Sequence, residues 1–148
     1  MEAGMRKVFD HERLEVYGAA IEFVVLAGRI LEGVPRGRSY VGDQLRRAAT
    51  SIVLNIAEGA GEIYPSDKAR FYRFACRSAT ECAAVLDVCR RTGLSREDQL
   101  DEGRDLLLRI VPMLVRLCKQ MERGPAGTGS GSGSGTDRRR DPGGAAPG

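Results

Sequence analysis

The 148-residue sequence contains no tryptophan, four tyrosines, four phenylalanines and one histidine. With so few aromatic residues, the sequence offers no aromatic-rich platform on which the bases of a nucleic acid could stack. A single histidine excludes the paired Glu-x-x-His motifs of di-iron bundle proteins, and no C-x-x-C-H haem motif occurs. His11 falls at the edge of the first predicted helix, where we expect a surface or capping role.

Cysteine is also scarce, and the four residues form no metal-binding pattern. There is no C-x-x-C pair, and no histidine lies near any cysteine, so a zinc site is not predicted. All four fall within apolar helical patterns, which indicates small buried side chains in a reducing cytosol. We expect neither a metal nor a cofactor. The cysteines are Cys76, Cys82, Cys89 and Cys118.

Long apolar runs are absent. None approaches the roughly 20 residues that a membrane-spanning helix needs. The first residues, MEAGMRKVFDHERLEVY, are too charged for a signal peptide. We therefore expect a soluble, cytoplasmic protein with no membrane partner.

The last part of the sequence lacks large apolar residues altogether. Residues 124–148 read GPAGTGSGSGSGTDRRRDPGGAAPG, and such a segment cannot bury enough surface to offset its ordering entropy. Gly/Ser-rich composition is typical of a flexible coil. We predict a disordered tail over 124–148 and one domain over 1–123. The net charge of +3 does not by itself indicate a nucleic-acid partner.

Helical periodicity is the strongest pattern present. Apolar residues at steps of three and four predict helices over about 10–32, 39–59, 66–92 and 96–122. Ser66 is expected to cap the third helix and Gly93 to end it. Amphipathic helices of this length with short connections predict an all-α fold, an antiparallel up-down-up-down four-helix bundle.

Two further details concern helix ends and shape. Ser95 and Asp98 resemble a capping box at the start of the fourth helix. Pro112 lies inside that helix, where its missing backbone donor predicts a kink. Gly59 is expected to end the second helix with a permissive turn.

Each helix has a predicted inner stripe. In the first helix it consists of Leu14, Tyr17, Ile21, Val24 and Leu31. In the third helix it consists of Phe71, Phe74, Ser78, Cys82, Val85 and Cys89. In the fourth helix it consists of Leu100, Leu107, Ile110, Leu114, Leu117 and Met121.

The second helix is unusual because it is apolar on two sides. One stripe consists of Leu45, Ala48, Ile52 and Ile56. The other, rotated from it, consists of Ala49, Val53 and Ala57. A helix that is apolar nearly all round is covered nearly all round. We therefore predict that a second subunit covers the second stripe, and apolar excess in the first and fourth helices also favours a homo-oligomer.

A few polar residues interrupt the second and third helices. Ser51, Asn55 and Glu58 lie about one turn apart, and Ser78 and Glu81 occupy the third helix. If the two helices are antiparallel neighbours, these groups can meet in a network that fixes helix register. No nucleophile with an adjacent base accompanies them, so we predict no catalytic residues and no enzyme activity.

These same blocks carry a family resemblance. The segments QLRRAATSIVLNIAEGAGE and FYRFACRSATECAAVLD resemble the 23S ribosomal RNA intervening-sequence proteins over residues from about 9 to 121. The resemblance implies a four-helix bundle assembled as a homopentameric ring. The family also includes the accessory variability determinant of diversity-generating retroelements, which binds nucleic acid and a reverse transcriptase through a basic surface. The present sequence departs from the family by lacking an early tryptophan and by placing Glu62 where arginine is common.

Basic residues gather in the middle of the sequence. The candidate nucleic-acid-binding residues are Arg46, Arg47, Lys68, Arg70, Arg73 and Arg77. Repeated around a ring, they would form a positive surface that displaces counterions from phosphates. The competing interpretation is a solvated face with local ion pairs, such as Arg77 with Glu81. We hypothesise an oligomeric adaptor that binds RNA or DNA with low specificity, or alternatively a protein-only scaffold.

Overall fold

The computed structural model describes residue 4 and residues 6–124. The described residues form four α-helices and no strand, which confirms the all-α prediction. The helices are α1 (Glu15–Glu32), α2 (Ser39–Gly61), α3 (Pro65–Thr92) and α4 (Glu97–Arg123), with 3-10 turns η1 (Asp10–Arg13) and η2 (Arg36–Arg38). Apart from Gly124, the predicted tail lies outside the described residues.

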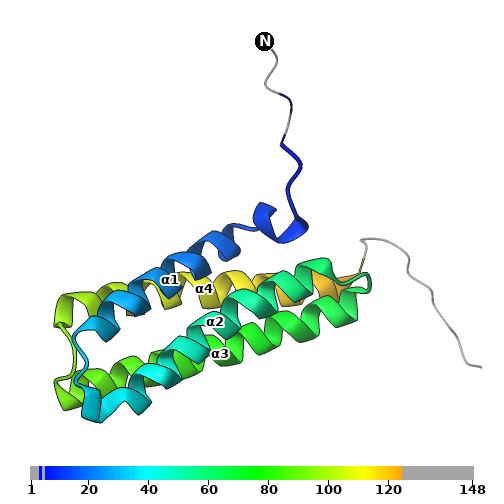
Figure 1. Cartoon of the computed structure of the whole chain (residues 1–148). Helices are drawn as coiled ribbons and strands as arrows, with labels where there is room; N and C mark the ends of the chain where they lie inside the picture. Colours follow the sequence, from blue (N-terminus) through cyan, green and yellow to red (C-terminus); the bar gives the residue numbers. More distant parts are fainter. Residues whose placement is uncertain (1–3, 5, 125–148) are drawn as a thin grey trace, which may run out of the picture.

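The four helices lie side by side and enclose one core (Figure 1). Helix α2 contacts α1 and α3, and α4 contacts α3 and α1, so each helix has two neighbours. Connections of a few residues, such as 62–64 between α2 and α3, keep consecutive helices adjacent. Within the described part of the chain, no helix is long and apolar enough to cross a membrane.

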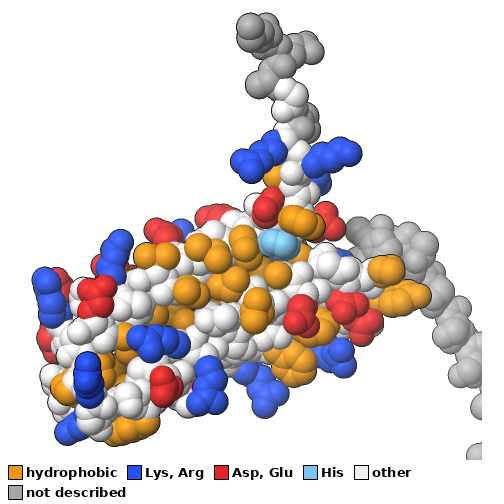
Figure 2. Space-filling view, in the orientation of Figure 1, with side chains coloured by type: hydrophobic (Ala, Val, Ile, Leu, Met, Phe, Trp, Pro, Cys, Tyr) orange, Lys and Arg blue, Asp and Glu red, His pale blue; other side chains and the backbone are white. Residues whose placement is uncertain are grey.

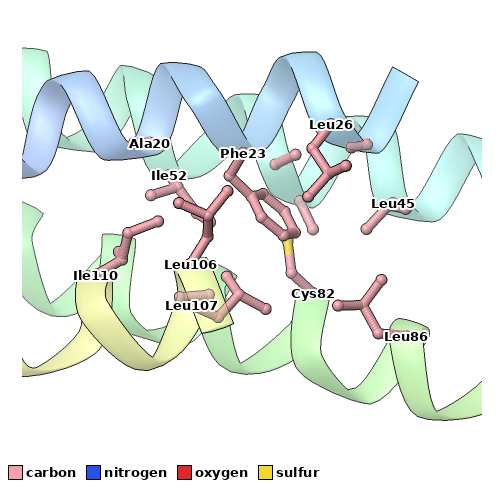
Figure 3. Close-up of a cluster of buried hydrophobic side chains, with 14 of the residues drawn as sticks. Ala20, Phe23, Leu26, Leu45, Ile52, Cys82, Leu86, Leu106, Leu107 and Ile110 are labelled. Carbon is pink, nitrogen blue, oxygen red and sulfur yellow. The ribbon is translucent and has the colours of Figure 1, made fainter. Parts of the chain in front are cut away.

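All four helices contribute to the core. Phe23 of α1 is fully buried and lies near Cys82 of α3 (Figure 3). Ile52 of α2 and Ile110 of α4 are also fully buried. Burial of side chains of this size contributes about 1.5–3 kcal/mol each and drives the four helices together.

The first helix differs from its prediction. The segment from Asp10 to Arg13 is a separate 3-10 turn, and α1 begins only at Glu15. The predicted inner stripe is rotated, because Ile21 is 39% exposed whereas Phe23 is buried. Of the predicted stripe only Leu31 is fully within the core, and Leu14, Tyr17 and Val24 are half-buried at its edge.

In helix α2 the first predicted apolar stripe faces the core, but the explanation predicted for the second stripe is wrong. Leu45, Ala48, Ile52 and Ile56 are all buried. Ala49 and Val53 are buried as well, within this single chain, and Ala57 is half-buried. The prediction that a second subunit must cover Ala49 and Val53 was therefore wrong. Helices α1 and α3 and the turn η1 all contact α2, so Ala49 and Val53 are buried by parts of the same chain.

Helix α3 also faces the core with different residues from those predicted. Phe74 is 38% exposed, and Phe71, Ser78 and Val85 are only half-buried. The buried residues of α3 are Ala69, Tyr72, Ala75, Ala79, Cys82, Leu86 and Cys89. Five of these seven residues are alanine or cysteine, and such small side chains allow the neighbouring helices to approach closely.

Helix α4 largely follows its prediction. Its core residues include Leu100, Leu107, Ile110 and Leu114, while Leu117 and Met121 are half-buried. The helix continues through Pro112, whose ring lies on the exposed side.

The helix ends show which capping predictions were wrong. Helix α3 begins at Pro65, with Tyr64 as N-cap and no side-chain cap, so Ser66 is already inside the helix. Gly93 does end α3, with φ of 65° and the Leu94 amide donating to the Cys89 carbonyl. Helix α4 has no capping box.

Two side chains explain the missing capping box. The Ser95 hydroxyl donates to the carbonyl of Ile30 at 3.4 Å, which ties the α3–α4 connection to α1. Asp98 instead pairs with Arg96, and this hydrogen-bonded guanidinium lowers the pKa of the Asp98 carboxyl. Neither group is left to cap the helix.

Gly59 has a different role from the predicted turn. Helix α2 continues to Gly61, and Gly59 is buried inside it. A Cβ at Gly59 would lie 2.7 Å from Cε1 of Tyr72, too close for any real side chain. Glycine is therefore needed where α2 and α3 approach one another.

Candidate nucleic-acid interface on helices α2 and α3

Hydrogen bonds between α2 and α3 bring part of the predicted polar network together. The hydroxyls of Ser51 and Ser78 are 2.8 Å apart. The amide of Asn55 donates to the Ser51 carbonyl at 2.8 Å and to the Ser51 hydroxyl at 3.0 Å. A hydroxyl, an amide and a carbonyl thus satisfy one another in a half-buried position, which fixes the register of the two helices.

The other two predicted members lie elsewhere. Glu81 accepts a hydrogen bond from the side-chain amide of Gln44, whose participation the sequence reasoning missed. Gln44 precedes Ser51 by seven residues on α2, so its position on the same face was a usable signal. Glu58 is exposed, and no partner for it occurs among residues 6–124. It does not belong to the network.

Lys68 is not available to a ligand in this arrangement. Its ammonium donates to the carbonyl of Ala60 at 2.8 Å and to that of Gly59 at 3.3 Å. These carbonyls belong to the last turn of α2, where backbone acceptors have no helical partner and a positive charge is favoured. The prediction that Lys68 belongs to the nucleic-acid-binding set is corrected, since its role is to close the end of α2.

Arg73 differs from the other arginines of α3 because it has a partner. Arg70, Arg73 and Arg77 follow steps of three and four residues, so they lie within about 60° of one another on one face of the helix. Arg73 forms an ion pair with Glu122 of α4 at 3.0 Å. The stripe is therefore single, but one of its three charges is already paired.

The remaining arginines are exposed and do not form ion pairs within the described part of the chain. Arg46 and Arg47 lie on the outer side of α2, and Arg77 lies on α3 next to Ser78. The proposed ion pair between Arg77 and Glu81 is absent, because Glu81 binds Gln44 instead. The guanidinium of Arg70 sits 5.2 Å from the ring centre of Phe71, a cation–π contact that leaves its charge unneutralised.

Of these arginines, Arg46 and Arg47 line an open hollow of about 460 Å³ on α2. Its lining consists of Arg46, Arg47, Thr50, Ser51, Leu54, Asn55 and Glu58. Lys and Arg side chains project along the edge of the bundle formed by α2 and α3 (Figure 2). The guanidinium groups of Arg46 and Arg47 are suited to phosphate oxygens, since each can donate charge-assisted hydrogen bonds. The Glu58 carboxylate in the same lining opposes an anion.

A second hollow, of about 390 Å³, was not predicted from the sequence. It is more apolar and lies between the start of α2 and the end of α3. Tyr40, Val41, Asp43, Gln44, Arg47, Val85 and Val88 line it. Tyr40 is 65% exposed. A tyrosine in the first turn of a helix was the sequence feature that could have indicated this hollow.

The cysteines behave as buried thiols. Cys82, Cys89 and Cys118 are buried and Cys76 is half-buried. Burial raises the pKa of Cys82 to about 12 and that of Cys76 to about 11, so these groups are protonated at neutral pH. No group of residues able to hold a metal ion occurs within residues 6–124. His11 packs between the rings of Phe9 and Tyr17, with centroid distances of 5.6 and 4.6 Å.

Residues 12–116 match the protein family described as 23S rRNA-intervening sequence protein. This match covers most of the chain, including α1, α2 and α3 in full and α4 as far as residue 116. The chain belongs to that family. The match includes the polar network and the exposed arginines of α2 and α3.

A solved structure agrees with this family assignment at the level of the fold. It is a protein of unknown function from the S23 ribosomal protein family of Bacteroides thetaiotaomicron VPI-5482. Its sequence is 22% identical, with a TM-score of 0.65 over 70% of the present chain and 95% of that chain. A search of curated proteins gave no match.

Proposed function

We propose that this member of the 23S rRNA-intervening sequence protein family is a non-enzymatic, homo-oligomeric adaptor that binds the phosphates of RNA or DNA with low sequence specificity. The observation that carries the proposal is the set of exposed arginines beside the α2–α3 polar network. Arg46, Arg47, Arg70 and Arg77 constitute the proposed phosphate-binding set. Lys68 and Arg73 are left out of it, because other groups of the chain already bind their charges.

The geometry favours contact with the backbone of a nucleic acid over reading of its bases. The arginines follow the outer sides of two long helices, and no recognition helix projects from the bundle among the described residues. Contacts to phosphates position a protein without carrying sequence information. Binding is therefore expected to be weakly specific and to fall steeply with salt.

The proposal includes self-association of up-down-up-down bundles into a ring, for which the pentamer is favoured by the family resemblance. Apolar side chains remain exposed on α1 and α4 of the single chain. They include Ile21, Val25, Leu108 and Val115. A contact between subunits would cover such exposed apolar surface. A ring would also repeat the arginine set several times on one assembly.

An accessory role toward a reverse transcriptase remains part of this proposal, because related retroelement proteins have such a role. A reverse-transcriptase gene beside a variable-repeat target in the genome would support it. A location inside a ribosomal RNA gene would support the intervening-sequence role instead. Either setting is compatible with binding to phosphates.

The direct test is titration of labelled RNA and DNA at increasing salt. We expect log Kd to rise linearly with log salt, with a slope of about 0.7–0.9 for each phosphate neutralised. The paired change Arg47→Glu and Arg77→Glu should weaken binding to unrelated sequences about equally, while oligomer mass stays constant.

A matched control makes the same change of charge at a position outside the proposed phosphate-binding set. Arg116 lines the junction of α1 and α4, away from α2 and α3. Arg116→Glu should leave binding unchanged. Absence of binding to both RNA and DNA by the unmodified protein would overturn the proposal and favour a protein-only scaffold.

A further inference from the structure

The apolar hollow between the start of α2 and the end of α3 adjoins the arginine-lined hollow of α2. Arg47 lines both of them. Tyr40, Arg47 and Ser51 lie within about 40° of one another around α2 at 3.6 residues per turn, so the two hollows follow one face of the helix. Along the helix axis Tyr40 is about 10 Å from Arg47, at a rise of 1.5 Å per residue. A single extended ligand can therefore occupy both hollows.

Tyr40 supplies an exposed aromatic ring to the apolar hollow. It lies in the first turn of α2, and its side chain is 65% exposed. Val88 of α3 lines the same hollow and is 46% exposed. Packing within the chain thus leaves an aromatic ring and an aliphatic surface open to a ligand. The hollow of about 390 Å³ is large enough for one small planar group.

The charged groups of the apolar hollow favour a base over a phosphate as its occupant. Asp43 is exposed, lines the hollow and forms no ion pair with any of residues 6–124. Its carboxylate repels a phosphate but accepts a hydrogen bond from the exocyclic amino group of a base. Arg47 carries the opposite charge at the boundary of the two hollows and suits the neighbouring phosphate. The base and the phosphate of one nucleotide thus have separate places.

We propose that the apolar hollow receives one unstacked base of a single-stranded nucleic acid. The ring of Tyr40 stacks on the base, while Arg47 holds the neighbouring phosphate. Stacking accepts any base, because every base has a π-face, so binding remains weakly specific for sequence. A base inside a duplex is already stacked and paired, so it does not enter the hollow. The inference rests on the proposed function and narrows its ligand to a single strand.

The first test compares two tyrosines of almost equal exposure. Tyr40 is 65% and Tyr64 66% exposed, and Tyr64 lies beyond the opposite end of α2. Tyr40→Ala should weaken binding of a labelled single strand of about 12 nucleotides by about tenfold, because one stacked base is lost. Tyr64→Ala should leave binding unchanged, and Tyr40→Phe, which keeps the ring, should bind like the unmodified protein. Equal weakening by Tyr40→Ala and Tyr64→Ala would overturn the inference.

The dependence of binding on salt separates stacking from charge. Stacking releases no counterions, so Tyr40→Ala should raise Kd by the same factor at every salt concentration and leave the slope of log Kd against log salt unchanged. Arg47→Glu should lower that slope. Binding of a duplex of the same sequence should respond to Arg47→Glu but not to Tyr40→Ala. Equal losses for the single strand and the duplex in Tyr40→Ala would overturn the stacking role of Tyr40.

Photochemical cross-linking locates the base directly. A single strand that carries one halogenated pyrimidine is bound to the unmodified protein, irradiated and digested, and the cross-linked peptide is identified by mass spectrometry. We expect the cross-link at Tyr40, on the peptide that contains the start of α2. Cross-links confined to other parts of the chain would contradict a base in this hollow.

The outcomes separate this inference from the proposed function. A protein that binds single strands and duplexes alike, with no effect of Tyr40→Ala, keeps the phosphate-binding arginines and removes the base site alone. A protein that binds neither nucleic acid removes both. A change of oligomer mass in Tyr40→Ala, with single-strand binding unaltered, would show that the hollow is a contact between copies of the chain and would overturn the inference.

Discussion

The α2–α3 contact and the outer face of α1 use glycine in opposite ways. At Gly59 a Cβ would collide with Tyr72 at 2.7 Å, whereas at Gly28 it would meet nothing within 4 Å. Both glycines lie inside helices and both weaken the helix that contains them. The first weakening is offset by close packing within the chain, and the second is not. The structural role of a glycine inside a helix is therefore identified by the atoms that a Cβ at that position would meet.

The two regions also differ in polar chemistry. The α2–α3 contact contains the hydrogen bond between Ser51 and Ser78, and Asn55 completes it. On the outer face of α1, the exposed positions Gly18, Ile21, Val25 and Gly28 carry no polar side chain. The register of α2 and α3 is thus fixed by directional bonds, and these positions of α1 contain no such bond.

Breaking the α2–α3 contact should give the largest effect. Gly59→Val places two methyl groups against Tyr72, which is 3% exposed and has no space to move into. Overpacking of this kind costs about 2–3 kcal/mol. Chemical denaturation should show the loss, and Gly61→Val at the end of the same helix should show much less. Equal losses of stability in Gly59→Val and Gly61→Val would mean that valine destabilises the helix itself and not the α2–α3 contact.

The serine pair should give a smaller effect. Ser78→Ala removes one partner from a half-buried hydrogen bond, which costs about 1 kcal/mol. A double-mutant cycle with Ser51→Ala isolates the interaction between the two hydroxyls. Additive losses, with no coupling between the two sites, would show that the contact contributes nothing to register.

On the outer face of α1 the expected effect on stability has the opposite sign. Gly18→Ala should stabilise the folded chain by about 0.5–1 kcal/mol, because alanine favours the helix and its methyl group meets no neighbour. Denaturation at low protein concentration should measure this gain without contribution from association. A destabilised variant would show that the α1 face is covered within the chain.

The ion pair between Arg73 and Glu122 should contribute least. Both side chains are more than half exposed, at 53% and 57%, and such pairs contribute less than about 1 kcal/mol. Arg73→Gln should therefore change the melting temperature by a degree or so, and high salt should remove even that difference. A large effect of Arg73→Gln on nucleic-acid binding would return Arg73 to the phosphate-binding set.

Periodicity predicted the number and approximate extent of the helices because each has apolar residues at steps of three and four. It also identified the inner stripe of α2, where Leu45, Ile52 and Ile56 are large and unambiguous. It failed on α3. There the core side consists mainly of the small residues alanine and cysteine, and the larger Phe71 and Phe74 dominated the pattern although they lie at the edge.

The candidate site was only partly predictable for a related reason. Spacing placed Ser51, Asn55 and Ser78 together correctly, since Ser51 meets Ser78 across the two helices and Asn55 follows Ser51 by one turn. Spacing carries no information about which acceptor a long cationic side chain finds. Lys68 reaches back to α2 and Arg73 reaches α4, and these outcomes depend on how the helices are placed in space.

The bond from Lys68 to the end of α2 has a consequence for the order of folding. It closes the three-residue connection 62–64, so α2 and α3 meet through contacts that are short-range along the chain. Such contacts form with little loss of chain entropy, which favours this helical hairpin as the nucleus onto which α1 and α4 then pack. Replacing Lys68 by methionine should accordingly slow refolding while leaving the rate of unfolding almost unchanged.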